Sequence, residues 1–123
     1  MALSEELPIY ADLCSLSKLY CDQWNHLPKE IRQKYGYQLL DCCIEMKVMV
    51  FLINSSAGEE KQEAMRRLQI KYHYLKETNR TCTELQAFSS KGAADNIDKL
   101  MAKIGRHVTR WSKSRGVAQA DDE

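Results

Sequence analysis

The residues of clearest chemical potential are cations that recur along positions 99–115. Lys99, Lys103, Arg106, Arg110 and Lys113 follow one another at spacings of four, three, four and three residues. At 100° per helical residue, such spacings place the cations within an arc of about 80°. Neighbours on this arc are about 5 to 6 Å apart, a spacing suited to a phosphate backbone. We therefore predict a binding site for nucleic acid or a macromolecular partner formed by Lys99, Lys103, Arg106, Arg110, Lys113 and, just beyond them, Arg115.

The distribution of charge along the chain separates this region from the rest. The net charge is only +1, yet residues 57–115 contain thirteen basic and seven acidic residues. A lysine-rich solvated face is the alternative interpretation, and the pattern alone leaves both open. No aromatic residue interleaves the cations, so stacking of bases is not predicted.

Residues able to perform catalysis or hold a metal are scattered. His26, His73 and His107 form neither an HExxH motif nor an i, i+4 pair, and no glycine-rich phosphate loop is present. A nucleophilic cysteine paired with a histidine stays open as an alternative, without local support. We expect no catalytic residue, no metal and no cofactor, and hence no enzyme activity.

The cysteines form an odd set of five with no CxxC spacing. This pattern fits a reducing compartment and does not indicate a disulfide framework. The N-terminus carries Ser4, Glu5 and Glu6 where a secretory signal would be basic and then apolar. We therefore expect a cytoplasmic protein whose cysteines are small core residues.

Four long amphipathic segments must position the cations. The first two helices are predicted from about Pro8 to Asn25 and from about Pro28 to Asn54, with proline at each first turn. A third helix is predicted over about Glu59 to Phe88 and a fourth over about Ala94 to Ser114, ended by Gly116. The apolar face of the fourth helix lies opposite the cations and contains Ile97, Leu100, Met101, Ile104, Val108 and Trp111.

Short connections between long helices predict an all-α, antiparallel up-down-up-down four-helix bundle over residues 1–115. Residues 116–123 are expected to form a short, acidic, disordered tail. No apolar run approaches the roughly 18 residues of a membrane span, so no membrane association is expected.

Two features of the helices point to close packing. Gly36 and Gly105 lie inside predicted helices, where glycine costs about 1 kcal/mol relative to alanine, and a close helix approach is the simplest explanation. The second helix has apolar residues beyond one face, at Leu40, Cys43, Ile44, Val50 and Phe51. Apolar surface beyond a single core indicates an interface, so we expect self-association.

Short motifs at both ends of the chain resemble a known family. The motifs occur in this order: Leu7-Pro8-Ile9-Tyr10, then Leu27-Pro28-Lys29-Glu30 with Tyr35 and Gly36, and finally Ile104-Gly105-Arg106 with Trp111. In order and spacing, the chain resembles the Avd family, the accessory variability determinants of diversity-generating retroelements. The same fold group includes the four-helix bundle proteins encoded in intervening sequences of ribosomal RNA genes.

The resemblance implies a non-catalytic accessory protein that forms a homopentamer. It would bind the reverse transcriptase of the retroelement and its template-repeat RNA or RNA/cDNA, and support mutagenic cDNA synthesis. An intervening-sequence bundle protein of unknown role is the first alternative, and an unrelated enzyme or adaptor on a helical scaffold is the second. Genomic neighbourhood would distinguish these three classes.

Overall fold

The fold consists entirely of helices in the part of the chain that the structure describes. The computed structural model describes the backbone of residues 7–122 and the side chains of residues 7–111. Four long helices follow one another as α1 (Pro8–Gln23), α3 (Tyr37–Ser55), α4 (Gly58–Glu84) and α5 (Lys91–Asp122). Three short elements join α1 to α3, namely η2 (Trp24–His26), α2 (Lys29–Ile31) and the π-helical η3 (Arg32–Gly36). The all-α fold class predicted from the sequence is confirmed.

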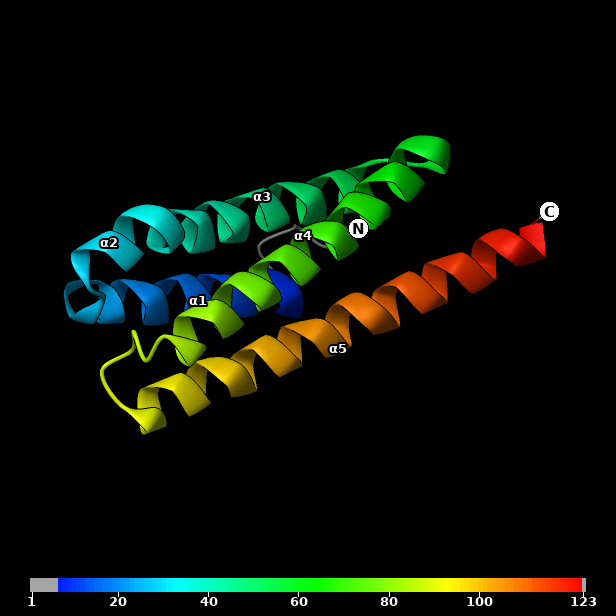
Figure 1. Ribbon diagram of the computed structural model, residues 1–123. Coiled ribbons are helices and arrows are strands. Elements are labelled where there is room, and N and C mark those ends of the chain that lie inside the picture. Colours follow the sequence, from blue (N-terminus) through cyan, green and yellow to red (C-terminus); the bar gives the residue numbers. More distant parts are fainter. Residues whose placement is uncertain (1–6, 123) are drawn as a thin grey trace.

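The long helices surround one apolar core (Figure 1). α3 packs against α4 and α1, and α5 packs against α1 and α4, so α3 and α5 lie diagonally across the bundle. The predicted apolar stripes supply most of the core, which includes Ile9, Leu13, Leu16, Tyr20, Leu39, Met46, Ile53, Leu68, Leu75, Ile97, Met101, Ile104 and Val108. Within residues 7–122, no helix is long and apolar enough to cross a membrane.

The corner between α1 and α3 explains the first helical glycine. A Cβ at Gly36 would lie 3.0 Å from the Trp24 ring, and that ring also meets Tyr37 edge-on at a centroid distance of 5.1 Å. Arg32 donates a hydrogen bond of 3.0 Å to the Leu27 carbonyl across the same corner. Gly36 therefore allows the close approach that the sequence predicted.

The end of α4 differs from the prediction. The helix ends at Glu84, not at Phe88, because Gln86 adopts a left-handed conformation with φ of 55°. The Ala87 amide donates to the Cys82 carbonyl and the Gln86 amide to the Thr83 carbonyl, both at 3.0 Å, which is a Schellman cap. Phe88 then folds back and stacks on Tyr20, with ring centroids 6.4 Å apart. Leu85, which lies beyond the end of the helix, is 52% exposed.

The C-terminal helix also differs in length. α5 begins at Lys91 and continues to Asp122, so Gly116 does not end it as predicted. One glycine costs a helix only about 1 kcal/mol and stops it only with a left-handed turn, whereas Gly116 has helical backbone here. The expectation of a disordered tail over 116–123 stays a prediction.

A buried polar network joins three of the long helices. Tyr20 of α1 donates a hydrogen bond of 2.7 Å to Oδ1 of Asn79 on α4, and Asn79 donates one of 3.2 Å to Asp98 on α5. Asn79 is a buried polar residue on the inward face of α4. The oxygen and the nitrogen of its side-chain amide each have a hydrogen-bond partner, so Asn79 fixes the register of α1, α4 and α5.

Candidate nucleic-acid interface

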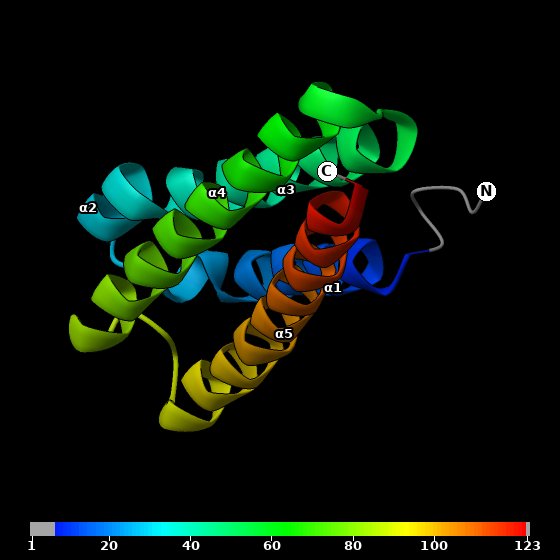
Figure 2. The same cartoon turned by 90° about the vertical axis from the view of Figure 1, so that its right-hand side faces the viewer.

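The predicted cations lie on the solvent side of α5. Lys99, Lys103, Arg106 and Arg110 are all exposed, while the helix turns its opposite face, centred on Ile104, into the core. Lys113 and Arg115 belong to α5, and their side chains lie outside the described residues. We call Lys99, Lys103, Arg106 and Arg110 the α5 ridge. Figure 2 shows α5 crossing the front of the bundle, with its outer side free of any other helix of residues 7–122.

One member of the ridge has a structural partner. The Nζ atom of Lys103 lies 3.3 Å from Oδ1 of Asp12, a side chain on α1 that is only 10% exposed. Nε2 of His107 lies 3.0 Å from the other oxygen of Asp12, an ion-pair distance at which the angles do not form a hydrogen bond. Lys103 therefore helps to hold α1 against α5, and its charge is partly neutralised there.

The structure adds cations from α4 to the same side of the molecule. A groove of about 640 Å³ between α4 and α5 is lined by His73 and Lys76 of α4 and by Arg106 and Arg110 of α5. A second hollow, which shares Tyr72, Lys76 and Ala102 with the first, extends to Arg80 and is also lined by Asp98. We call these joined hollows the α4–α5 groove. It extends the surface from a single helix to two.

The sequence contained a signal for the α4 contribution. His73, Lys76 and Arg80 are three and four residues apart and so share one helix face. The glutamates of the same helix favour ordinary ion pairing instead, since Glu63 lies four residues before Arg67. The actual partner of Glu63 is Arg66, at 2.7 Å, and Glu84 pairs with Arg80 at 3.1 Å.

Four cations of the described ridge and groove have no carboxylate partner within the described part of the chain. Among the described residues, no carboxylate lies within ion-pair distance of Lys76, Lys99, Arg106 or Arg110. Side chains of this kind can release counterions and bind phosphates without first breaking an ion pair. The ridge and groove together form a cationic surface of α4 and α5.

The floor of the groove depends on the second helical glycine. A Cβ at Gly105 would approach Cζ of Tyr72 to 2.7 Å, so the phenol ring lies directly on the α5 backbone. The Tyr72 hydroxyl donates a hydrogen bond of 3.2 Å to the Met101 carbonyl, and burial raises the pKa of the phenol. The close approach predicted at Gly105 is confirmed.

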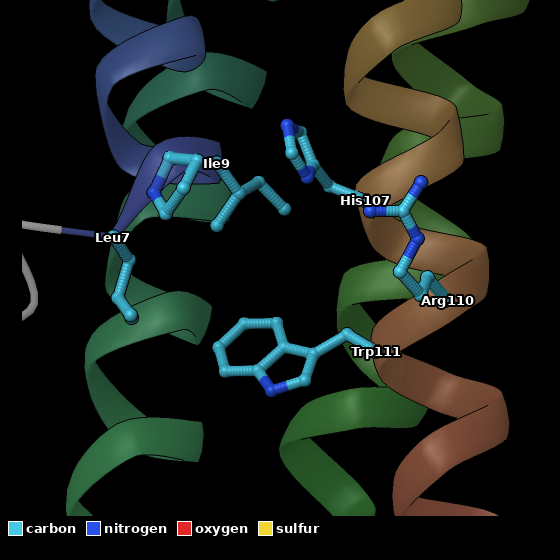
Figure 3. A pocket seen from close by; sticks show the side chains of 6 residues that line it. Leu7, Ile9, His107, Arg110 and Trp111 are labelled. Carbon is cyan, nitrogen blue, oxygen red and sulfur yellow. The ribbon is translucent and has the colours of Figure 1, made fainter.

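A separate cavity lies between the first turn of α1 and α5 (Figure 3). Leu7, Pro8 and Ile9 line one side, and His107, Arg110 and Trp111 line the other, around about 280 Å³. The Trp111 ring extends from α5 towards Leu7 and Ile9. The motifs at the two ends of the chain thus meet in one place.

In comparisons with known proteins, no family model and no curated protein matches the chain.

Cysteines and histidines do not converge on a reactive centre. Within the described residues, no three His, Cys, Asp or Glu side chains group closely enough to hold a metal. Burial raises the pKa values of the Cys42, Cys43 and Cys82 thiols to about 11, which keeps them protonated and weakly nucleophilic near neutral pH. Cys14 and Cys21 are exposed, so the prediction of five core cysteines is wrong for these two. Both lie off the Ile9 to Tyr20 stripe of α1.

Proposed function

We propose that this chain is a non-catalytic accessory protein of a diversity-generating retroelement. It binds the reverse transcriptase and the template RNA and supports mutagenic cDNA synthesis. The observation that carries the RNA-binding part is the cationic surface of α4 and α5, in which Lys76, Lys99, Arg106 and Arg110 have no carboxylate partner among the described residues. The retroelement context is supported by the resemblance to the Avd family.

The geometry suits recognition of a backbone more than recognition of sequence. Rigid helices present the charges at fixed spacing, and phosphate contacts supply affinity and position with little base preference. Template RNA would follow the groove between α4 and α5. Lys113 and Arg115, further along α5, would extend the contact.

Self-association is part of the proposal, as a homopentamer. α3 presents an exposed apolar stripe, which we call the α3 stripe, made of Tyr37, Ile44, Val48 and Phe51, with exposures of 46–57%. Because α3 and α5 lie diagonally, an assembly through this stripe would leave the cationic surfaces accessible. Repetition of that surface around a ring would raise the effective concentration of binding sites and compensate for the near-neutral subunit.

The finer architecture and location follow from the same proposal. An antiparallel up-down-up-down order of the helices is supported by short connections, two residues between α3 and α4 and six between α4 and α5. A cytoplasmic location would place the protein with its polymerase and RNA. The alternative function, an intervening-sequence bundle protein, would share the fold without the polymerase.

Co-expression with the reverse transcriptase of the retroelement tests the proposal. The chain should co-purify with the polymerase, and cDNA synthesis on template-repeat RNA should require both proteins. The chain alone should show no polymerase or nuclease activity. Absence of a reverse-transcriptase gene nearby, with placement of the gene inside a ribosomal RNA gene, would contradict the proposal and favour the alternative.

A further inference from the structure

The cavity between α1 and α5 combines apolar walls with a polar rim that includes the cationic side chain of Arg110. Its walls are the side chains of Leu7, Pro8 and Ile9 and the half-buried indole of Trp111, and its rim is formed by His107 and Arg110. In Figure 3, the indole and the imidazole both extend from α5 towards α1, whereas the Arg110 side chain stays on the α5 side of the cavity. The volume of about 280 Å³ is near the lower end, roughly 300 Å³, of ligand pockets. The cavity therefore suits one flat ring system.

Arg110 connects this cavity to the cationic surface. It lines both the cavity and the α4–α5 groove, and no described carboxylate pairs with it. A ligand with its anionic group on Arg110 could thus place a ring against Trp111 while the rest of it follows the groove. Unpaired bases of RNA, which stack on aromatic side chains while their phosphates contact arginine, have this combination of groups.

We infer that this cavity receives one unpaired nucleobase of single-stranded RNA, stacked on Trp111, with its phosphate bound by Arg110. The inference rests on the proposed RNA-binding function and adds the form of RNA that is recognised. Charge complementarity favours this occupant over an apolar peptide segment, because an apolar side chain would leave the Arg110 charge at the rim without a partner. Nε2 of His107 lies 3.0 Å from Oδ2 of Asp12, so this side of the rim also contacts α1.

The inference differs from an expectation from the sequence. Trp111 follows Arg110 directly in the chain but lies on the apolar face of α5, and the fold places the start of α1 against it. The protein should therefore prefer single-stranded over duplex RNA. Base identity should matter little, since every base offers an aromatic face.

Binding of a fluorescently labelled 12-nucleotide single strand and a duplex with the same number of phosphates tests the inference. Trp111→Leu keeps the wall apolar and should weaken single-strand binding roughly 5- to 150-fold, the range that base–aromatic stacking implies. Its salt dependence should match that of the parent, and duplex binding should stay unchanged. Trp111→Phe, which keeps a ring, should retain most of the single-strand affinity.

Intrinsic fluorescence provides a readout that needs no folded variant. Single-stranded RNA should quench the tryptophan emission of the parent, and the duplex should not. The other tryptophan, Trp24, packs against Gly36 and Tyr37, away from the cavity. The Trp111 variants keep only Trp24, so RNA should quench their tryptophan emission little. Unchanged parent emission at saturating single strand would overturn the inference.

The outcomes separate the inference from the proposal on which it rests. If the double variant Lys76→Gln, Arg106→Gln weakens RNA binding while Trp111→Leu binds the single strand as tightly as the parent, only the base pocket is wrong. If Trp111→Leu weakens single strand and duplex equally, the base pocket is again wrong. If the parent binds neither RNA at moderate salt, the proposed RNA-binding function is contradicted and the pocket falls with it.

Discussion

The phenol ring of Tyr72 on α4 lies against the backbone of Gly105 on α5. A Cβ at position 105 would approach Cζ of that ring to 2.7 Å, and the hydroxyl is anchored to the Met101 carbonyl at 3.2 Å. This one contact sets how closely α4 and α5 approach each other. It also forms the floor of the groove in which Lys76 and Arg106 face the same space.

Gly105→Ala should destabilise the fold even though alanine is the better helix former. Overpacking against Tyr72 costs about 1 to 3 kcal/mol, whereas the gain in helix propensity is about 1 kcal/mol. The net effect should be a loss of up to about 2 kcal/mol in the free energy of unfolding. Urea unfolding followed by circular dichroism measures this change.

Gly92→Ala is the matched control for this substitution. Gly92 also lies in α5, is exposed, and a Cβ there would meet only Ser90 Oγ at 3.7 Å, so its substitution should be neutral or stabilising. In a Tyr72→Ala background, Gly105→Ala should become neutral or stabilising as well. An equal loss in both backgrounds would show that the Tyr72 contact is not the cause.

The hydrogen bond between Tyr20 and Asn79 should be visible in a double-mutant cycle. Either Tyr20→Phe or Asn79→Leu leaves a buried polar atom without its partner and should cost about 1 to 3 kcal/mol. The double variant should lose less than the sum of the two single losses, because no orphaned partner remains at that bond. Strict additivity in urea unfolding would contradict a direct coupling across the 2.7 Å bond.

The buried thiols should make the fold sensitive to alkali. Burial raises the pKa values of Cys42, Cys43 and Cys82 from 9.0 to about 11. The unfolded chain releases these protons at lower pH than the folded chain, so the stability is complete below about pH 9 and falls as pH rises towards 11.

Urea unfolding midpoints at pH 7, 9, 10 and 11 test this dependence. The midpoint should change little from pH 7 to 9 and then fall. A variant with alanine at the three thiol positions should have a lower unfolding midpoint at pH 7, and its midpoint should fall less between pH 9 and 11. If the midpoints of the parent and the variant fall in parallel, groups other than these thiols cause the loss of stability at alkaline pH.

The α3 stripe should mediate self-association. Ile44→Glu with Phe51→Glu places two charges on side chains that are 57% and 55% exposed, which leaves the core intact and opposes an apolar interface. Light scattering coupled to size exclusion should give a pentameric mass for the parent and a smaller mass for this variant. Leu85→Glu, at a 52% exposed apolar residue beyond α4, is the control and should keep the parent mass. A monomeric parent at micromolar concentration would contradict the assembly.

Local periodicity was enough to predict most of the helices and their buried faces. On the predicted apolar face of α5, Ile97, Met101, Ile104 and Val108 are buried and Leu100 is partly buried, because a helix has a fixed repeat that the sequence displays directly. The end of α4 was not predictable in this way. Gln86 takes a left-handed conformation that its residue type does not favour, and burial of Phe88 against Tyr20, which lies on another helix, stabilises this turn.

The candidate site was predictable only in its one-helix part. The α5 ridge follows from spacing within one segment, whereas the groove requires α4 to lie beside α5 with Gly105 under Tyr72. The Trp111 cavity requires the start of α1 to lie against α5. Spacing within one segment therefore indicates the cations of α4 but neither the assembled groove nor the cavity. The pairing of Lys103 with Asp12 is equally non-local, and it makes Lys103 a poor choice for a test of RNA binding.

The most direct test of the central claim is the salt dependence of RNA binding by a triple variant of the cationic surface. This variant carries Lys76→Gln, Lys99→Gln and Arg106→Gln. It removes three unpaired charges from side chains that lie neither in the core nor in the Trp111 cavity. The control is Lys18→Gln, Lys29→Gln and Lys34→Gln, which removes the same charge from exposed positions outside α4 and α5. Fluorescence anisotropy with single-stranded RNA across a salt series should show that the triple variant binds with lower affinity. The slope of the log binding constant against the log salt concentration should be smaller in magnitude by about 2, since each single-strand phosphate contact contributes about 0.7. The control should match the parent, and a surface triple that binds with the parent's affinity and slope would contradict the account.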